Sequence, residues 1–370
     1  MSSHTTTGSI GLSLEPLDTL FFRDGRPFEA GFRATSGMPQ PQTLAGALRT
    51  WLLRRVGCDF EKLAEAMKEG RSFQQVAAEA QPPEVGQIAQ LRFRGPWFAL
   101  EGRPLVPAPA TLRRVKSEQK EENVIVRMEP LSDHDSLPGW SPAESGMRPV
   151  WLRDTRPTER VDSGYLTLSG LKTFLEGETP CSKQDIVRAE KLFGLDHRTG
   201  IAVNPEKLSA EESMIYGIGL LALKKEVSLY AEVTGPEEAL RLLPDEPTTL
   251  PLGGEGRRVI LKRQQPVQWP QVAASDGNKP LLLLTSPGLF NGWRPERLKG
   301  NLLGAVVPGY VAVSGWDLAR KGPKPARFAV AAGSVYFLKE DLDLSDGSLC
   351  EGEDATLGWG TFLKGVWDYV

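Results

Sequence analysis

The sequence contains little of the material from which metal sites, disulfides and catalytic triads are built. Its 370 residues include three cysteines and three histidines. Cys58, Cys181 and Cys350 are far apart and form no CxxC pair, which argues against a disulfide framework and against a zinc site of standard spacing. The sequence therefore predicts no metal site and no cofactor.

Long apolar runs and an excess of basic charge are also missing. The longest apolar stretches, 215–223 and 281–284, fall far short of the roughly 18 residues of a membrane span. Residues 1–8 are polar and lack the basic and apolar regions of a secretory signal, so we expect a cytoplasmic protein. The formal net charge is −3, so any contact with RNA has to come from a local basic patch.

What the sequence does contain is enough apolar material for a folded core, together with many turn formers. Hydrophobic residues make up 40% of the chain, and 38 glycines and 29 prolines indicate many turns and irregular connections. The length suits two domains. Residues 265–280 are polar and punctuated by proline, which is typical of a linker. We therefore predict domains over 8–267 and 277–370.

The spacing of apolar residues predicts an α+β fold made of two ferredoxin-like units. In the first domain we expect helices over 43–56, capped by Thr43, and 237–243, and strands over 10–22, 91–100, 105–110, 220–233 and 257–263. This is the order of a βαββαβ unit with large insertions, one of them at 113–160. A second, degenerate unit is predicted from β-like runs over 281–285, 303–314, 327–338 and 361–370. Further short helices are expected over 169–175 and 183–193.

Two glycine clusters are candidates for contact with phosphate. Gly253-Gly254-Glu255-Gly256-Arg257-Arg258 combines glycines, which let a backbone approach a phosphate closely, with two guanidinium groups. No GK[ST] follows, so this is not a nucleotide-binding P-loop, and the alternative is a tight turn before a strand. Gly358-Trp359-Gly360, followed by Lys364, repeats the pattern near the C-terminus, where the alternative is a simple hairpin.

Arginines and aromatic residues are interleaved around the first strand and the first helix. Six arginines could line one groove, although Arg54 and Arg55 are alternatively ordinary charges at the C-terminus of a helix: Arg23, Arg26, Arg33, Arg49, Arg54 and Arg55. The aromatic residues there could stack bases, although core packing is the alternative for them: Phe21, Phe22, Phe28, Phe32 and Trp51.

The histidines give weaker signals. His197 lies beside Arg198 in a turn-rich segment and could act as a general acid or base in RNA cleavage. No second catalytic group accompanies it, so an exposed turn histidine is the favoured interpretation. His134 lies between two aspartates but in an irregular excursion, and a metal role is disfavoured.

One strongly acidic run stands near the end of the chain. Residues 340–354 contain seven acids and no base, so they would repel RNA. The run predicts either a solvated loop or a face turned toward a basic protein partner.

Eight segments together resemble one family, the third Cmr subunit of type III-B CRISPR effector complexes. They run in the same order along nearly the whole chain: LEPLDTLFFRDGRPFEAG (14–31), PQPQTLAGALRTWL (39–52), GLDHRTGIAVN (194–204), EESMIYGIG (211–219), LGGEGRR (252–258), TSPGLFNGW (285–293), SGWDLARKGPKPARFAVAAGSVYF (314–337) and GWGTFLKGVW (358–367). The type III-A counterpart has loops of the same kind, and the residues do not separate the two subtypes.

The resemblance implies a RAMP-superfamily protein of two ferredoxin-like domains that is not an enzyme. In that family the subunit holds the 5′ repeat-derived tag of the crRNA and docks against the large polymerase/cyclase-like subunit and the adjacent backbone subunit. The expected RNA-binding residues are Arg23, Arg26, Arg49, His197, Arg198, Gly253, Gly254, Arg257, Arg258, Gly358, Gly360 and Lys364. The alternatives are a RAMP-type crRNA-processing endoribonuclease that uses His197, and a scaffold that touches only protein.

Overall fold

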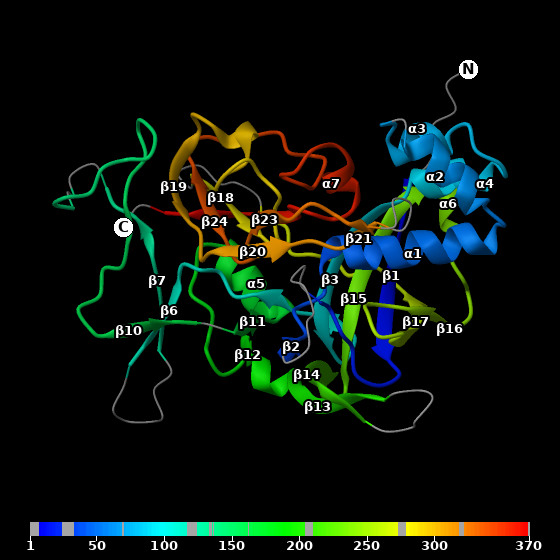
Figure 1. Ribbon diagram of the computed structural model, residues 1–370. Coiled ribbons are helices and arrows are strands. Elements are labelled where there is room, and N and C mark those ends of the chain that lie inside the picture. Colours follow the sequence, from blue (N-terminus) through cyan, green and yellow to red (C-terminus); the bar gives the residue numbers. More distant parts are fainter. Residues whose placement is uncertain are drawn as a thin grey trace, which may run out of the picture. The chain divides into compact units, whose positions relative to one another are not determined.

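The computed structural model describes residues 7–23, 33–68, 70–116, 124–132, 135, 137–161, 163–203, 210–272, 279–317 and 322–368 (Figure 1). The fold is mixed α+β, with many small sheets and few helices. The chain forms two compact units, each assembled from three stretches: 1–96, 192–266 and 312–327 in the first, and 97–191, 267–311 and 328–370 in the second. None of the helices in the described ranges is long and apolar enough to cross a membrane.

The first unit is built on an antiparallel sheet in the order β16-β17-β1-β15-β3. Its strands are β1 (Thr7–Pro16), β3 (Arg92–Leu100), β15 (Val227–Pro236), β16 (Thr248–Pro251) and β17 (Arg258–Gln264). If the strands β1, β3, β15 and β17 are numbered 1 to 4 as they occur in the chain, their order across the sheet is 4-1-3-2. Leu14 is paired with Leu229 on one side and Leu261 on the other, and all three are fully buried. Alternation of apolar residues along these strands therefore produces one buried apolar face.

Helices and a long hairpin complete the first unit. Helix α1 buries Leu44, Leu48 and Leu52, which the helical period places on one stripe. The hairpin of β13 and β14 carries the short strand β2 parallel to β14. The remaining elements are α1 (Pro41–Arg55), α2 (Phe60–Lys68), α3 (Phe73–Ala77), α4 (Glu84–Ala89), α6 (Glu237–Leu240), β2 (Arg33–Thr35), β13 (Phe193–Val203), β14 (Ala210–Leu223), β21 (Trp316–Asp317) and β22 (Gly322–Pro323).

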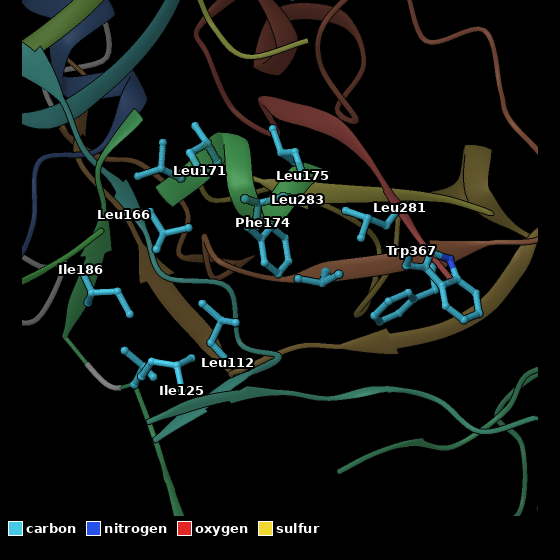
Figure 2. Close-up of a cluster of buried hydrophobic side chains, with 14 of the residues drawn as sticks. Leu112, Ile125, Leu166, Leu171, Phe174, Leu175, Ile186, Leu281, Leu283 and Trp367 are labelled. Atoms are coloured by element: carbon cyan, nitrogen blue, oxygen red, sulfur yellow. The ribbon is translucent and has the colours of Figure 1, made fainter. Parts of the chain in front are cut away.

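The second unit has a four-stranded antiparallel sheet in the order β19-β24-β18-β25. If these four strands are numbered as they occur in the chain, from β18 as 1 to β25 as 4, their order across the sheet is 2-3-1-4. Read from the opposite edge of the sheet, this is 4-1-3-2. Its core includes Phe174 of α5, Leu283 of β18 and Trp367 of β25 (Figure 2). The rings of Phe337 and Trp367 meet edge to face at 5.2 Å, a favourable aromatic geometry.

The other elements of the second unit are short. Residues 113–160, predicted as an irregular excursion, contain two small sheets, β10-β6-β7 and β8-β9. The bounds are β4 (Arg103–Pro104), β5 (Val106–Pro107), β6 (Leu112–Val115), β7 (Ile125–Arg127), β8 (Glu129–Pro130), β9 (Val150–Trp151), β10 (Thr158–Arg160), β11 (Gly164–Leu166), α5 (Leu168–Leu175), β12 (Ile186–Arg188), η1 (Ala189–Lys191), β18 (Lys279–Leu284), η2 (Glu296–Leu298), β19 (Leu302–Val306), β24 (Val335–Leu338), α7 (Gly352–Thr356) and β25 (Phe362–Trp367). Strands β20 (Tyr310–Val313) and β23 (Arg327–Val330) form a two-stranded sheet.

Some predicted elements are wrong, for local reasons. The strand expected over 220–233 is broken between Leu223 and Val227 by a turn in which Glu226 has a φ of 67°. Helix α1 begins at Pro41, whose fixed φ suits the first helical position, and not after a Thr43 cap. The helix expected over 183–193 is a short strand followed by a 3₁₀ turn.

Candidate nucleic-acid interface

The Gly253–Arg258 loop connects β16 to β17 and has a backbone shape that depends on glycine. Gly253 and Gly256 have φ angles of 85° and 63°, in the left-handed region, and Glu255 lies there too at 56°. The Gly254 N–H donates to the carbonyl of Phe21 at 2.7 Å. Among the described residues, none accepts a hydrogen bond from the N–H groups of Gly253, Glu255 or Gly256. The loop therefore presents backbone donors suited to an anion.

The segment that leaves β1 is anchored beside this loop. Besides the bond from Gly254, the Phe22 N–H donates to Ser36 Oγ at 2.9 Å and the Phe22 carbonyl accepts from Gly37 at 2.8 Å. Phe21 and Phe22 are only 3% and 5% exposed, so of the two interpretations of these rings the structure supports core packing, and neither ring is free to stack a base. Arg23, the next residue, is exposed.

Two of the predicted arginines converge on one carboxylate. Arg257 Nη1 lies 2.8 Å from Asp18 Oδ2, and Arg198 Nη2 lies 3.6 Å from the same oxygen. Arg198 also pairs with Asp196 at 2.8 Å. The backbone N–H of Thr19, and after it the charges of Arg198 and Arg257, hold the pKa of Asp18 below its usual value against the cost of desolvation. We call Asp18, Asp196, Arg198 and loop 253–258 the glycine–arginine cluster.

The remaining predicted residues of the first unit lie in different environments. His197 is exposed on β13 opposite Gly219, next to Arg198. Arg258 is exposed and donates to Thr249. Arg26 lies outside the described residues. Arg49 is only 7% exposed, with its guanidinium 5.1 Å and 5.4 Å from the rings of Phe73 and Phe93, so it packs α1 and does not line a surface.

The glycines predicted in the second unit are held in an internal network. Gly360 donates to the Pro287 carbonyl at 2.8 Å, and Gly358 donates to Ala355 at 3.2 Å. Lys364 Nζ bonds to Asp341 at 2.8 Å and to the Leu342 carbonyl at 2.6 Å. These contacts use the donors that a phosphate would need.

On the face of the main sheet opposite its apolar side, the residues of β15 are buried. Tyr230 is fully buried, and its hydroxyl donates to Glu232 at 2.8 Å. Glu232 is 3% exposed and pairs with Arg94 at 3.0 Å. These β15 residues alternate with Leu229 and offer no exposed ring to a base.

Sequence reasoning missed Asp18, which organises the cluster. Asp18 lies inside the strand predicted over 10–22, whereas the observed β1 ends at Pro16, so the only sequence signal was a charged residue within a largely apolar run. In the described part of the chain, no group of three or more His, Cys, Asp or Glu side chains could hold a metal ion.

One family model matches nearly the whole chain. Residues 12–367 match the family described as CRISPR-associated protein (Cas_Cmr3). A chain of the type III-B Cmr-beta complex bound to cognate target RNA is similar, with 16% identity, coverage of 95% of this chain and 96% of that one, and a TM-score of 0.50. A chain of the Csm3-Csm4 subcomplex of the type III-A complex aligns with 12% identity over 96% and 98% of the two chains, at a TM-score of 0.44. No curated protein sequence matches.

The family match covers nearly the whole chain, from β1 to β25, and includes every element of the glycine–arginine cluster. The chain belongs to the CRISPR-associated Cas_Cmr3 family.

Proposed function

We propose that the protein is a non-catalytic subunit of a type III-B CRISPR effector complex and that it binds the 5′ repeat-derived tag of the crRNA through the glycine–arginine cluster. The observation that carries the proposal is the convergence of Asp18, Arg198 and the 253–258 loop, which are far apart in the sequence. Family membership supports it, as does the likeness to a chain of a type III-B Cmr-beta complex bound to cognate target RNA.

The chemistry of the cluster suits an RNA backbone. The N–H groups of Gly253, Glu255 and Gly256 donate to phosphate oxygens, while Arg198 and Arg257 supply charge. The proposal also includes the exposed residues Arg23, His197 and Arg258, which neighbour the cluster or its anchoring segment in the sequence, and Arg26, which belongs to the same segment as Arg23. Arg49 is left out because it is buried, and Gly358, Gly360 and Lys364 because their donors are used internally.

We infer in addition that the chain is built from two ferredoxin-like RAMP domains, whose sheets lie within the predicted ranges 8–267 and 277–370. Residues 97–191, which the first range includes, pack in the second compact unit. The 4-1-3-2 order of antiparallel strands occurs once inside each of these ranges, which supports the inference. The proposed partners are the large polymerase/cyclase-like subunit and the adjacent backbone subunit, in the cytoplasm. Asp341 and Asp346 of the acidic run are paired with Lys364 and Arg297, and the exposed acids that we propose for contact with a basic partner are Glu340, Asp343 and Glu351.

The first experiment is UV crosslinking of the purified protein, together with its large-subunit partner, to crRNA that carries the 5′ tag, followed by peptide mapping and a gel. Intact RNA with crosslinks at residues 18–23 or 253–258 is the expected result. Cleaved RNA would identify an endoribonuclease and direct attention to His197. The absence of any crosslink would leave a protein-only scaffold.

A variant with both Arg257→Ala and Arg258→Ala tests the residue assignment. Since each phosphate contact to a single strand contributes about 0.7 to the slope of log K against log salt, we expect weaker binding and a slope reduced by about 1.4. Arg241→Ala is the matched control, because Arg241 is an exposed arginine of the same unit that pairs with Glu237 within one helical turn. Equal crRNA retention by both variants across salt concentrations would overturn the assignment.

A further inference from the structure

The arginines of the proposed interface already have an anionic partner in the protein without RNA. Asp18 Oδ2 lies 2.8 Å from Arg257 and 3.6 Å from Arg198, and Asp196 lies 2.8 Å from Arg198. Two guanidinium groups therefore face two carboxylates, and their formal charges cancel. A surface meant to attract RNA by charge alone would not be neutralised in this way.

The ion pairs of Asp18 are of a kind that an incoming anion can replace. The side chains of Asp18 and Arg198 are 57% and 46% exposed, and that of Arg257 is 21% exposed, so the carboxylate is open to solvent although one of its partners is partly buried. Pairs between exposed charged side chains contribute little to stability. A phosphate oxygen can take the position of the carboxylate oxygen on a guanidinium, because both anions accept the same N–H donors.

The backbone donors of the loop remain outside this arrangement. Gly253, Glu255 and Gly256 donate to no described residue, and Asp18 accepts from Arg257 and Thr19. A ligand that reaches the loop and the arginines together thus gains contacts that Asp18 does not already supply. A single phosphate that contacts only the arginines replaces the Asp18 carboxylate with another anion and gains no additional contacts.

We propose that Asp18 is an intramolecular competitor of RNA phosphate at the glycine–arginine cluster. This inference rests on the proposed function, because it concerns the regulation of the same site. Asp18 occupies Arg257 and Arg198 in the RNA-free protein, and a phosphate of the bound strand displaces it. The consequence is lower affinity for any anion that cannot also bind the loop, and hence a preference for an RNA segment that follows the cluster.

The test compares Asp18→Asn with the unchanged protein. Asparagine has nearly the same shape and keeps an acceptor oxygen but removes the charge. The probe is a fluorescein-labelled crRNA that begins with its repeat-derived 5′ tag, and binding to the full chain is followed by anisotropy across a salt series. We expect Asp18→Asn to bind about fivefold tighter, since it removes the repulsion between one carboxylate and one nearby phosphate in a water-exposed site.

Two further variants give the result its meaning. Asp245→Asn is the charge-matched control, because Asp245 pairs with Arg263 away from the cluster and is 84% exposed. It should change the affinity less than twofold. Arg257→Ala reports on the interface itself, and thermal unfolding of each variant reports on the fold.

The possible outcomes separate the two proposals. If Arg257→Ala binds the probe as tightly as the unchanged protein, the cluster is not the RNA interface and the proposed function fails at this site. If Arg257→Ala weakens binding while Asp18→Asn leaves it equal or weaker, Asp18 positions the arginines and does not compete with phosphate. The inference is supported if Arg257→Ala weakens binding and Asp18→Asn tightens it while Asp245→Asn does not.

Discussion

The Gly253–Arg258 loop gives the sharpest test of how backbone shape supports the candidate interface. Gly253 has a φ of 85°, and a Cβ at this position would clash with the carbonyl oxygen of Phe21. That carbonyl accepts the hydrogen bond from Gly254. A Gly253→Ala chain therefore has to adopt an unfavourable backbone conformation and also shift the loop away from Phe21.

Gly256 provides a matched comparison in the same loop. Its φ of 63° is also left-handed, but nothing lies within 4 Å of a Cβ built there. Alanine in the left-handed region costs about 1 kcal/mol. Loss of the hydrogen bond from Gly254 to the Phe21 carbonyl costs about 1 kcal/mol more. The backbone shift that moves the new Cβ away from this carbonyl is a further cost, which only Gly253→Ala carries. We expect the free energy of unfolding to fall by about 2–3 kcal/mol for Gly253→Ala and about 1 kcal/mol for Gly256→Ala.

The assay is urea unfolding of both variants, together with the crRNA crosslinking described above. Gly253→Ala should also weaken RNA binding more than Gly256→Ala, because a loop that moves away from Phe21 carries Arg257 with it. Equal losses of stability in the two variants would refute the reasoning, since they would mean that the approach to the Phe21 carbonyl has no energetic weight.

Two further predictions concern residues outside the cluster. Arg49→Met keeps an apolar stem but removes the cation over Phe73 and Phe93. We expect the free energy of unfolding, measured by heat or urea, to fall by about 1–2 kcal/mol, and RNA binding by the folded protein to be unchanged. Weaker RNA binding without a loss of stability would mean that Arg49 belongs to the interface. Burial raises the pKa of Tyr165 to about 12, so the unfolded chain ionises first as the pH rises above about 10 and the native state loses stability up to about pH 12. Tyr165→Phe lacks this ionisation, and its stability relative to the unchanged protein should rise over that pH range; parallel curves would contradict the shift.

Much of the strand framework could be predicted from apolar spacing, because alternating buried residues leave a direct trace in the sequence. The strand predicted over 91–100 and the observed β3 (Arg92–Leu100) nearly coincide, as do 257–263 and β17 (Arg258–Gln264). The break between Leu223 and Val227 could also have been read, since Lys224-Lys225-Glu226 is a charged interruption between two apolar runs. The prediction of one continuous strand over 220–233 gave more weight to the apolar residues on both sides than to this charged turn.

The site was less predictable, because ion pairs between distant segments leave no local trace. Asp18 is followed by 179 residues before Arg198 and by 238 before Arg257. Arg49 is a different case. It follows Ala45 by four residues and precedes Leu52 by three, and both are fully buried, so the helical period already placed Arg49 on the core stripe. The prediction that Arg49 lines a surface gave more weight to its charge than to its position on the buried side of the helix.

The two glycine clusters show why a glycine-rich sequence does not by itself indicate a phosphate site. Both contain glycines with positive φ, and a basic residue follows each one. In Gly358-Trp359-Gly360, however, the carbonyls and N–H groups of the glycines bond to the surrounding chain, and Ser286 Oγ donates to the Gly358 carbonyl at 2.7 Å. That network surrounds the fully buried Trp359 and uses the N–H groups of both glycines. In the 253–258 loop one N–H, that of Gly254, anchors the turn while its neighbours bond to no described residue. Backbone donors that bond to no described residue, beside arginines held by an exposed carboxylate, and not the number of glycines, are therefore the reason why we propose the first cluster as the RNA interface.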